Sequence, residues 1–175
     1  GLEGLRLWVC LLVFCLVPSL SFALPSGYHT ESGDVSYDAS LDNTLVIRAS
    51  DHAIISFDTF SIAQNEVVRF IQPLESSSVL SRVTGNSFSD ISGSLFANGQ
   101  LVLVNSNGIN FNQSANVQVQ SLIASTLNIQ SAMYLNNNMS FEKTFGSNPG
   151  KILNEANIAV ADRGHLVLLS ENIEN

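Results

Sequence analysis

The sequence predicts an all-β solenoid, a chain that winds into stacked coils of short strands. Its apolar residues gather in short runs rich in β-branched side chains, and Gly, Asn, Ser and Asp separate these runs. Two segments recur along the chain with nearly the same pattern. Asparagine, which is depleted in ordinary strands, is frequent at the ends of the runs. These observations favour coils with polar corners over a β-sandwich.

The length and composition suit one folded domain with an acidic surface. The chain has 175 residues, of which 45% are hydrophobic and 13% charged, and its formal net charge is -8. This apolar content is enough for a core and argues against a disordered chain. A nucleic-acid-binding domain needs a basic face for the phosphates, so the acidic charge disfavours that class.

Residues 1–23 are predicted to be a signal peptide. An apolar run, 7–17, follows Arg6 and is shorter than the roughly 20 residues of a membrane-spanning helix. The positions that signal peptidase inspects carry the small residues Ser21 and Ala23, so cleavage is expected after Ala23.

Both cysteines of the chain, Cys10 and Cys15, lie inside this segment, where they are interpreted as small apolar residues. The mature chain, 24–175, then has no cysteine and is not a disulfide-stapled secreted domain. Such a chain suits passage through a narrow pore in the unfolded state, because no crosslinked loop obstructs it.

Internal similarity supports the solenoid. Gly99-x-Leu-Val-Leu-Val, which leads to Asn107, recurs 65 positions later as Gly164-x-Leu-Val-Leu-Leu, which leads to Asn172. We interpret this offset as three coils of roughly 20 to 22 residues.

A second similarity has a shorter offset. Asn116 and its neighbours recur 41 positions later around Asn157, which we interpret as two coils. Residues 131–150 break the rhythm and are expected to leave the coil stack as a hairpin.

The asparagines beside strands are expected to form the corners of the coils. Asn tolerates left-handed backbone angles, and its amide can bond to the same residue type one coil away. We assign this turn or ladder role to Asn105, Asn107, Asn116 and Asn157, with Gly99, Gly164 and Asn172 at equivalent turns.

The stretch 99–112 is expected to form a strand, a tight turn and a second strand. An apolar run, 101–104, precedes Asn107-Gly108, a dipeptide that favours a turn with positive φ at both central positions. After the turn, Ile109 and Phe111 alternate with asparagines, the pattern of a half-buried strand.

The order of several such segments resembles a known family. The chain is similar to the N-terminal secretion domain, also called the haemagglutination activity domain, of filamentous-haemagglutinin-type exoproteins of two-partner secretion systems in Gram-negative bacteria. The segments that carry the resemblance are, in order, Phe57-Asp-Thr-Phe-Ser-Ile62, Glu66-x-Val-x-Phe70, Arg82-Val-Thr-Gly85, Ser89-x-Ile91-x-Gly93-x-Leu95, Asn105-Ser-Asn-Gly-Ile109, Leu122-Ile-Ala-Ser-Thr-Leu127 and Gly164-x-Leu-Val-Leu168. The family's Asn-Pro-Asn-Gly-Ile motif has Pro where this chain has Ser106, which does not pre-set φ.

The resemblance implies a fold and a function for residues 24–175, which it covers almost completely. It implies a right-handed single-stranded parallel β-helix with an N-terminal cap and small extra β elements, truncated at its C-terminal end. It also implies a domain that targets a haemagglutinin-like adhesin for secretion and nucleates its folding. An outer-membrane β-barrel transporter with periplasmic docking domains is the implied partner, and the secretion motif is Asn105, Ser106, Asn107, Gly108 and Ile109. The exoprotein then passes through the periplasm to the medium or cell surface, and its downstream regions contact host-cell or bacterial surfaces.

The sequence predicts no catalytic residue, metal site or cofactor. His52 follows Asp51, but neighbours on a strand point to opposite faces, and His165 replaces Gln100 at a variable position of the repeat, where a solvent-facing role is expected. His29 belongs to no recognisable motif, and the chain contains neither a Gly-x-Ser-x-Gly elbow nor a His-Glu-x-x-His, phosphate-loop or Asp-x-Asp calcium motif.

Two alternative functions stay open at the level of sequence. A β-helical carbohydrate-active enzyme, such as a pectate-lyase type, would place Arg82 or Arg163 beside two carboxylates in an open groove. The expected role of Arg82 is instead structural hydrogen bonding, as core packing is for Phe57, Phe60 and Phe70. The other alternative is an adhesive solenoid that leaves the cell by a different route.

Overall fold

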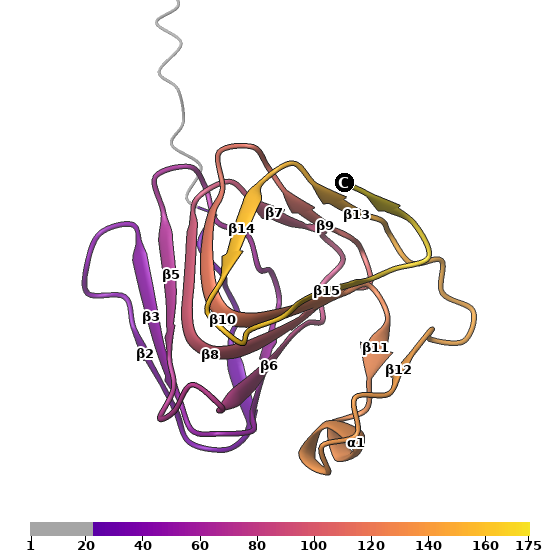
Figure 1. Ribbon diagram of the computed structural model, residues 1–175, viewed down its shortest axis with the longest axis horizontal. Coiled ribbons are helices and arrows are strands. Elements are labelled where there is room, and N and C mark those ends of the chain that lie inside the picture. Colours follow the sequence, from indigo (N-terminus) through magenta and orange to yellow (C-terminus); the bar gives the residue numbers. More distant parts are fainter. Residues whose placement is uncertain (1–22) are drawn as a thin grey trace, which may run out of the picture.

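Three columns of parallel strands wind around one apolar core in the computed structural model, which describes residues 23–175 (Figure 1). The predicted signal peptide lies outside the described residues, except for Ala23. The first column contains β3 (Thr44–Ala49), β5 (Val67–Ile71), the first half of β8 (Ser94–Val104), the first half of β10 (Asn116–Ser125) and β14 (Asn157–Val160). The second contains β4 (Ala53–Phe57), β6 (Ser78–Val83), the second halves of β8 and β10, and β15 (Leu166–Leu169). The third contains β7 (Ser89–Ile91), β9 (Ile109–Phe111), β13 (Ile152–Asn154) and β16 (Ile173–Glu174). The predicted parallel β-helix is confirmed.

The core forms because alternate side chains of each strand point into the coil. Phe57, Phe60 and Phe70 are at most 1% exposed, and their rings follow one another at centroid distances of 5.2 and 6.4 Å. Core packing is therefore confirmed as their role.

An N-terminal cap pairs with the first coil, as expected. Strand β1 (His29–Ser32) is antiparallel to β4, and β2 (Val35–Asp38) is antiparallel to β3. The cap occupies edges that would otherwise present unpaired backbone groups.

Residues 128–149, called the excursion from here on, leave the coils and pack on the outside of the second column. The excursion contains β11 (Asn128–Ile129) and β12 (Phe141–Glu142), which pair antiparallel, and the five-residue helix α1 (Ser131–Leu135), which the sequence did not predict. Tyr134 of α1 is fully buried in a second apolar cluster made by outward-facing residues of the second column. Figure 1 shows the excursion in orange, projecting from the coils.

The excursion corrects the interpretation of the repeats. Asn116 pairs directly with Asn157, so the offset of 41 positions is one coil and not two. Leu101 pairs with Leu122, and Leu122 pairs with Leu166, so the offset of 65 is two coils and not three. The offsets are long because one coil contains the excursion, which adds residues without adding a turn of the helix.

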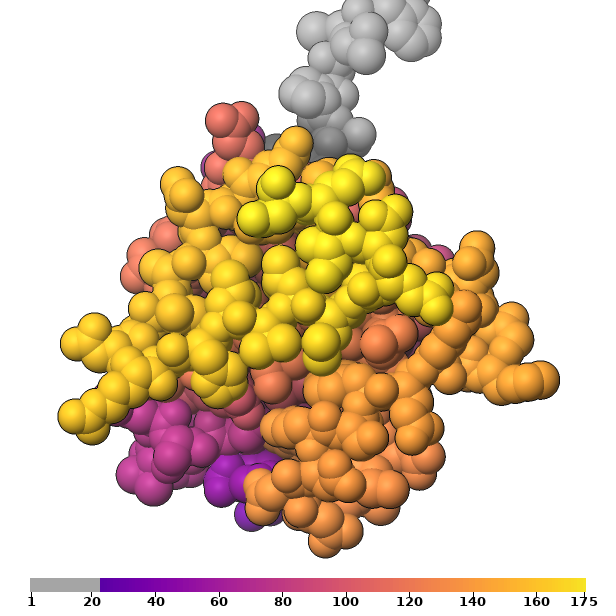
Figure 2. All heavy atoms as spheres, turned by 45° about the vertical axis from the view of Figure 1, so that its right-hand side comes forward, coloured from indigo at the N-terminus to yellow at the C-terminus, as the bar shows by residue number. Residues whose placement is uncertain are grey.

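The last coil lies on the surface of the molecule, shown in yellow in Figure 2 beside the orange excursion. Leu166 is 39% exposed and Ile173 is 41% exposed. None of the helices within residues 23–175 has the length and apolarity needed to cross a membrane.

Candidate functional site

The candidate secretion motif forms the corner between β8 and β9, where the second column passes to the third. The carbonyl of Asn105 accepts from the Gly108 backbone N–H at 3.1 Å, which closes a β-turn with Ser106 and Asn107 at its centre. The side-chain Oδ1 of Asn105 accepts from the Asn107 backbone N–H at 3.0 Å, which forms an Asx turn within the same corner.

The backbone angles differ from the prediction for Asn107-Gly108. Gly108 has φ +121°, but Asn107 does not have a positive φ. The prediction was wrong because the turn begins at Asn105, one residue earlier than assumed, so Gly108 is its last residue and not a central one. A Cβ on Gly108 would lie 3.1 Å from the carbonyl oxygen of Lys151, in addition to the backbone strain.

Asn105 fixes this corner to the preceding coil. Its side chain is fully buried, and its Nδ2 donates to the Ser87 carbonyl at 3.0 Å and to Ser89 Oγ at 2.9 Å. Its Oδ1 also accepts from Asn107 Nδ2 at 3.0 Å. The buried amide thus has partners for both its donors and its acceptor.

Asn107 makes a second link to the preceding coil. Its Nδ2 donates to the carbonyl of Gly85 at 2.8 Å. Gly85 ends the Arg82-Val-Thr-Gly85 block, so two of the segments that carry the family resemblance are joined here by a hydrogen bond.

The following coil binds the other side of the corner. The Gly150 N–H donates to the carbonyl of Ser106 at 2.8 Å, and the Ile109 N–H donates to the carbonyl of Lys151 at 3.1 Å. Ile109 is buried at the start of β9, whereas the side chain of Ser106 is exposed. Gly150 and Lys151 follow the excursion and lead into β13. The excursion therefore occupies the corner of the next coil that is equivalent to 105–109.

The other predicted turn residues lie in three different places. Asn116 and Asn157 are neighbours in backbone register, but among the described residues the Asn116 amide oxygen accepts from Gln118 and not from Asn157. Asn172 lies at the next equivalent corner, and its carbonyl accepts from the Ile152 N–H at 3.0 Å.

Gly99 and Gly164 lie where backbones approach closely. A Cβ on Gly99 would lie 2.6 Å from the Ser77 carbonyl oxygen, and one on Gly164 would lie 2.8 Å from the Ala161 carbonyl oxygen. Both positions therefore require glycine for space.

Arg82 holds the excursion to the cap, which confirms its expected structural role. Its guanidinium donates to the Ile129 carbonyl at 2.6 Å, to Asn128 Oδ1 at 3.1 Å and to Glu31 Oε2 at 3.2 Å. Among residues 23–175, Glu31 is the one carboxylate that pairs with Arg82, whereas the enzyme alternative expected two. Arg163 lines a hollow of about 320 Å³ in which Glu75 is the single carboxylate.

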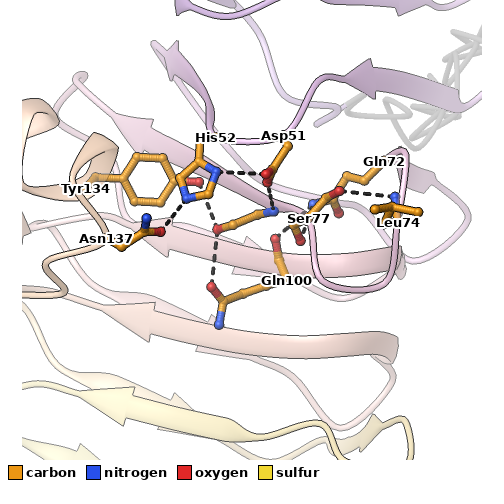
Figure 3. Close-up of polar contacts among 9 residues, drawn as sticks. Asp51, His52, Gln72, Leu74, Ser77, Gln100, Tyr134 and Asn137 are labelled. Carbon is orange, nitrogen blue, oxygen red and sulfur yellow. Dashed lines mark hydrogen bonds and ion pairs between the residues drawn. The ribbon is translucent and has the colours of Figure 1, made fainter.

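Asp51 and His52 contact each other, contrary to the prediction. They lie in the turn before β4, where His52 has φ +58°, and not on a strand. His52 Nδ1 lies 3.0 Å from Asp51 Oδ2, and His52 Nε2 donates to Asn137 Oδ1 at 2.6 Å. Figure 3 shows the His52 ring between these two partners, with Tyr134 beside it. Asn137 could not be predicted as a partner of His52, because it lies 85 positions away.

The electrostatics favour the charged forms of both residues. The Asn137 hydrogen bond, aided by Asp51 and opposed by partial burial, raises the pKa of His52. Burial works against ionisation of Asp51, but hydrogen bonds from Ser78 and His52 outweigh it and lower the Asp51 pKa. Asp51 therefore supports the charged form of His52, and His52 holds the excursion to the first coil through its hydrogen bond to Asn137.

A neighbouring polar chain runs across the second column. Tyr134 donates its hydroxyl to Ser78 Oγ at 2.8 Å, and Ser78 Oγ donates to Gln100 Oε1 at 3.2 Å (Figure 3). Burial raises the pKa of Tyr134, so this hydroxyl stays protonated. Gln100 Nε2 donates to Nε2 of His165, which is exposed as expected.

These contacts join coils to one another and to the excursion. Within residues 23–175, no three His, Cys, Asp or Glu side chains are grouped as metal ligands would be. The chain is therefore a parallel β-helix in which polar side chains hold neighbouring coils together at the corners and hold the excursion to the coils. This arrangement is that of a β-solenoid scaffold.

Comparison with known proteins identifies which scaffold this is. The family described as the TPS secretion domain matches residues 22–175, and the chain belongs to this family. The chain is 32% identical over 120 residues to a heme/hemopexin-binding protein of Haemophilus influenzae, and 33% identical over 107 residues to the protein of that name in H. influenzae strain Rd. These matches cover 68% and 61% of this chain, but only 13% and 12% of the relatives.

A solved structure agrees in fold and sequence. The crystal structure of the HMW1 secretion domain from H. influenzae matches with a TM-score of 0.79 and 35% identity, over 82% of this chain and 38% of that one. The resemblance seen in the sequence is confirmed. The chain is a secretion-targeting domain of a secreted protein of a Gram-negative bacterium, and its family is one of secretion domains and not of enzymes.

Proposed function

We propose that the corner 105–109 is the element by which a cognate outer-membrane transporter recognises this domain, through docking domains in the periplasm. The observation that supports this is the local character of the turn. The bonds from Asn105 to Asn107 and to Gly108 span two and three positions, so they can form before any coil exists. A chain that crosses the periplasm unfolded can thus present this shape.

The same corner then nucleates folding outside the cell. Once the chain has emerged, Asn105 and Asn107 bond to the preceding coil, and Ser106 accepts a bond from the following one. Because coils contact only their neighbours, a formed corner favours the addition of the next coil.

Substitution of Gly108 tests the recognition role. We expect Gly108→Val to abolish secretion while synthesis and periplasmic delivery continue, because valine is strained at φ +121°. Asn107→Ala, which loses the local bond from its Nδ2 to Asn105 Oδ1, is also expected to abolish secretion. The measurement is the amount of the exoprotein in the medium and in the periplasm of cells that contain the transporter.

A glycine in the excursion provides the matched control. Gly146 also has a positive φ, of +75°, but no atom lies within 4 Å of a Cβ built on it. Gly146→Val should be exported normally. Refolding of each purified variant separates a folding defect from a recognition defect, and normal export of Gly108→Val would refute the proposal.

The rest of the exoprotein is proposed to be an adhesin without catalytic activity, whose downstream regions contact host-cell or bacterial surfaces. The chain spans 13% of the length of its curated relative, which leaves room for such regions. Two assays test this reading: attachment of cells that express the full exoprotein, and polysaccharide cleavage by the purified protein. Export in a strain that lacks the transporter would favour the alternative of an adhesive solenoid with another route.

A further inference from the structure

A buried carboxylate lies beside the predicted cleavage site of the signal peptide. Glu66, at the end of the loop before β5, is only 3% exposed. Its Oε2 accepts from the Ala63 N–H at 2.8 Å, and its Oε1 accepts from the Ala23 N–H at 2.9 Å. Among residues 23–175, no Lys, Arg or His forms an ion pair with it.

Cleavage after Ala23 would remove one of these two partners. A buried carboxylate that loses a hydrogen bond and has no counter-charge is strongly unfavourable. The same hydrolysis supplies a replacement. Water adds across the Ala23–Leu24 peptide bond, so that Ala23 leaves with a carboxylate and Leu24 keeps the nitrogen as an ammonium group.

The new ammonium group would lie close to the nitrogen that it replaces. The Leu24 nitrogen is three covalent bonds from the Ala23 nitrogen, with lengths of about 1.46, 1.52 and 1.33 Å. Leu24 packs against the core and Pro25 is buried. The Ser26 N–H donates to the Thr59 carbonyl at 3.0 Å, which holds the segment in place.

We propose that Glu66 is the binding site for the α-ammonium group of the processed chain, so that removal of the signal peptide completes an ion pair at the base of the β-helix. The hollow around Ala23, about 420 Å³ in volume, gives the group room to turn toward Oε1. Asp90 lines the same hollow and is exposed, and Asp58 lies beside Gly27. Of these acids, Glu66 is the one that is buried and that bonds to Ala23. The proposal rests on cleavage after Ala23 and is independent of how the transporter recognises the domain.

The pKa of the α-amine in the secreted, full-length protein tests the proposal. Mass spectrometry of the intact protein should first show that it begins at Leu24. Acetylation of the α-amine with a pH-dependent amine reagent then gives its titration midpoint. We expect a midpoint at least about one pH unit above the ordinary value of about 7.7 to 8.0, so that labelling near pH 8 is roughly fivefold slower.

Three variants make the result specific. Glu66→Gln should return the midpoint toward the ordinary value, whereas Asp90→Asn, which changes an exposed acid in the same hollow, should lower it much less. Three residues, Ala-Gln-Gln, inserted between Ala23 and Leu24 place a backbone N–H at the position of the Ala23 nitrogen and the ammonium group two residues beyond it, away from an intact Glu66. This insertion should return the midpoint toward the ordinary value, and it tests the proposal even if Glu66→Gln does not fold. An ordinary midpoint in the unaltered protein, a midpoint that the insertion leaves unchanged, or a chain that begins elsewhere would overturn the proposal.

Discussion

At the scale of single residues, Asn105 is the buried residue whose side-chain hydrogen bonds fix the corner 105–109. It is fully buried and bonds to Ser87, Ser89 and Asn107. Replacing it leaves several buried groups without partners, and each such group costs roughly 1 to 3 kcal/mol.

Asn105→Ala is therefore expected to lower the free energy of unfolding by about 2 to 4 kcal/mol. Urea unfolding of the purified domain measures this change. Asn136→Ala, at an exposed position of the excursion, is the matched control and should change the stability by less than about 0.5 kcal/mol. Equal effects of the two substitutions would show that Asn105 does not fix the corner.

Ser106 is expected to tolerate the proline that the family motif has at this position. Ser106 is exposed and is the first central residue of the turn, a position that favours proline. Ser106→Pro should raise the unfolding free energy by about 0.4 to 1 kcal/mol, because proline restricts the unfolded chain. A clear loss of stability in the same urea experiment would contradict this description of the turn.

Sequence reasoning located the corner but not its bonding. The Asn-Gly dipeptide and the flanking alternation were enough to place a turn between two strands. The burial of Asn105 could not be seen, because its partners Ser87 and Ser89 lie in the preceding coil and bond to it only when the coils stack. The turn also begins one residue earlier than predicted, because the local Asx bond of Asn105 outweighs the preference of Asn107-Gly108.

At the scale of elements, the excursion is held to the body by a buried side chain and two polar clasps. Tyr134 fills the apolar cluster outside the second column, Arg82 binds the start of the excursion, and His52 binds Asn137 near the end of α1. The sequence showed that these residues interrupt the repeat. It did not show that they form a helix, or that this helix packs against the second column. A five-residue helix has too few turns for a periodic pattern, and its contacts are long-range.

The His52 clasp predicts that docking of the excursion depends on pH. The pKa of His52 is raised in the folded state, so its contribution is complete below the ordinary value near 6.5 and is lost as the pH rises through the raised value. The pKa of Asp51 is lowered, so its contribution is present above the ordinary value of 3.8 and is lost as the pH falls through the lowered one. The excursion should be held most firmly between about pH 4 and 6.5.

Hydrogen exchange of the α1 amides, corrected for the intrinsic effect of pH, measures this dependence. Protection should decrease above pH 6.5 in the unaltered protein and become independent of pH there in His52→Gln. His29→Gln, in cap strand β1, is the control and should retain the decrease. If His52→Gln retained it as well, another group would be responsible.

At the scale of the whole molecule, the parallel stack determines how far a local defect spreads. Each coil pairs with the coil before it and the coil after it, and the last coil has a neighbour on one side only within the described residues. The sequence predicted this architecture through its repeated strands. The number of coils between the repeated segments was predicted wrongly, because the excursion adds residues between them without changing the register of the strands.

The position of a core residue along the stack should decide whether its loss is global or local. Phe70 lies in the second strand of the first column, against Phe60, and is 1% exposed. Phe70→Ala is expected to lower the unfolding free energy of the domain by about 3 to 5 kcal/mol and to reduce amide protection from β3 to β10. Leu168 is half-buried in β15, and Leu168→Ala should reduce protection only in β14 to β16. Hydrogen exchange with mass spectrometry compares the two variants, and a uniform loss of protection in Leu168→Ala would show that the coils unfold as one unit.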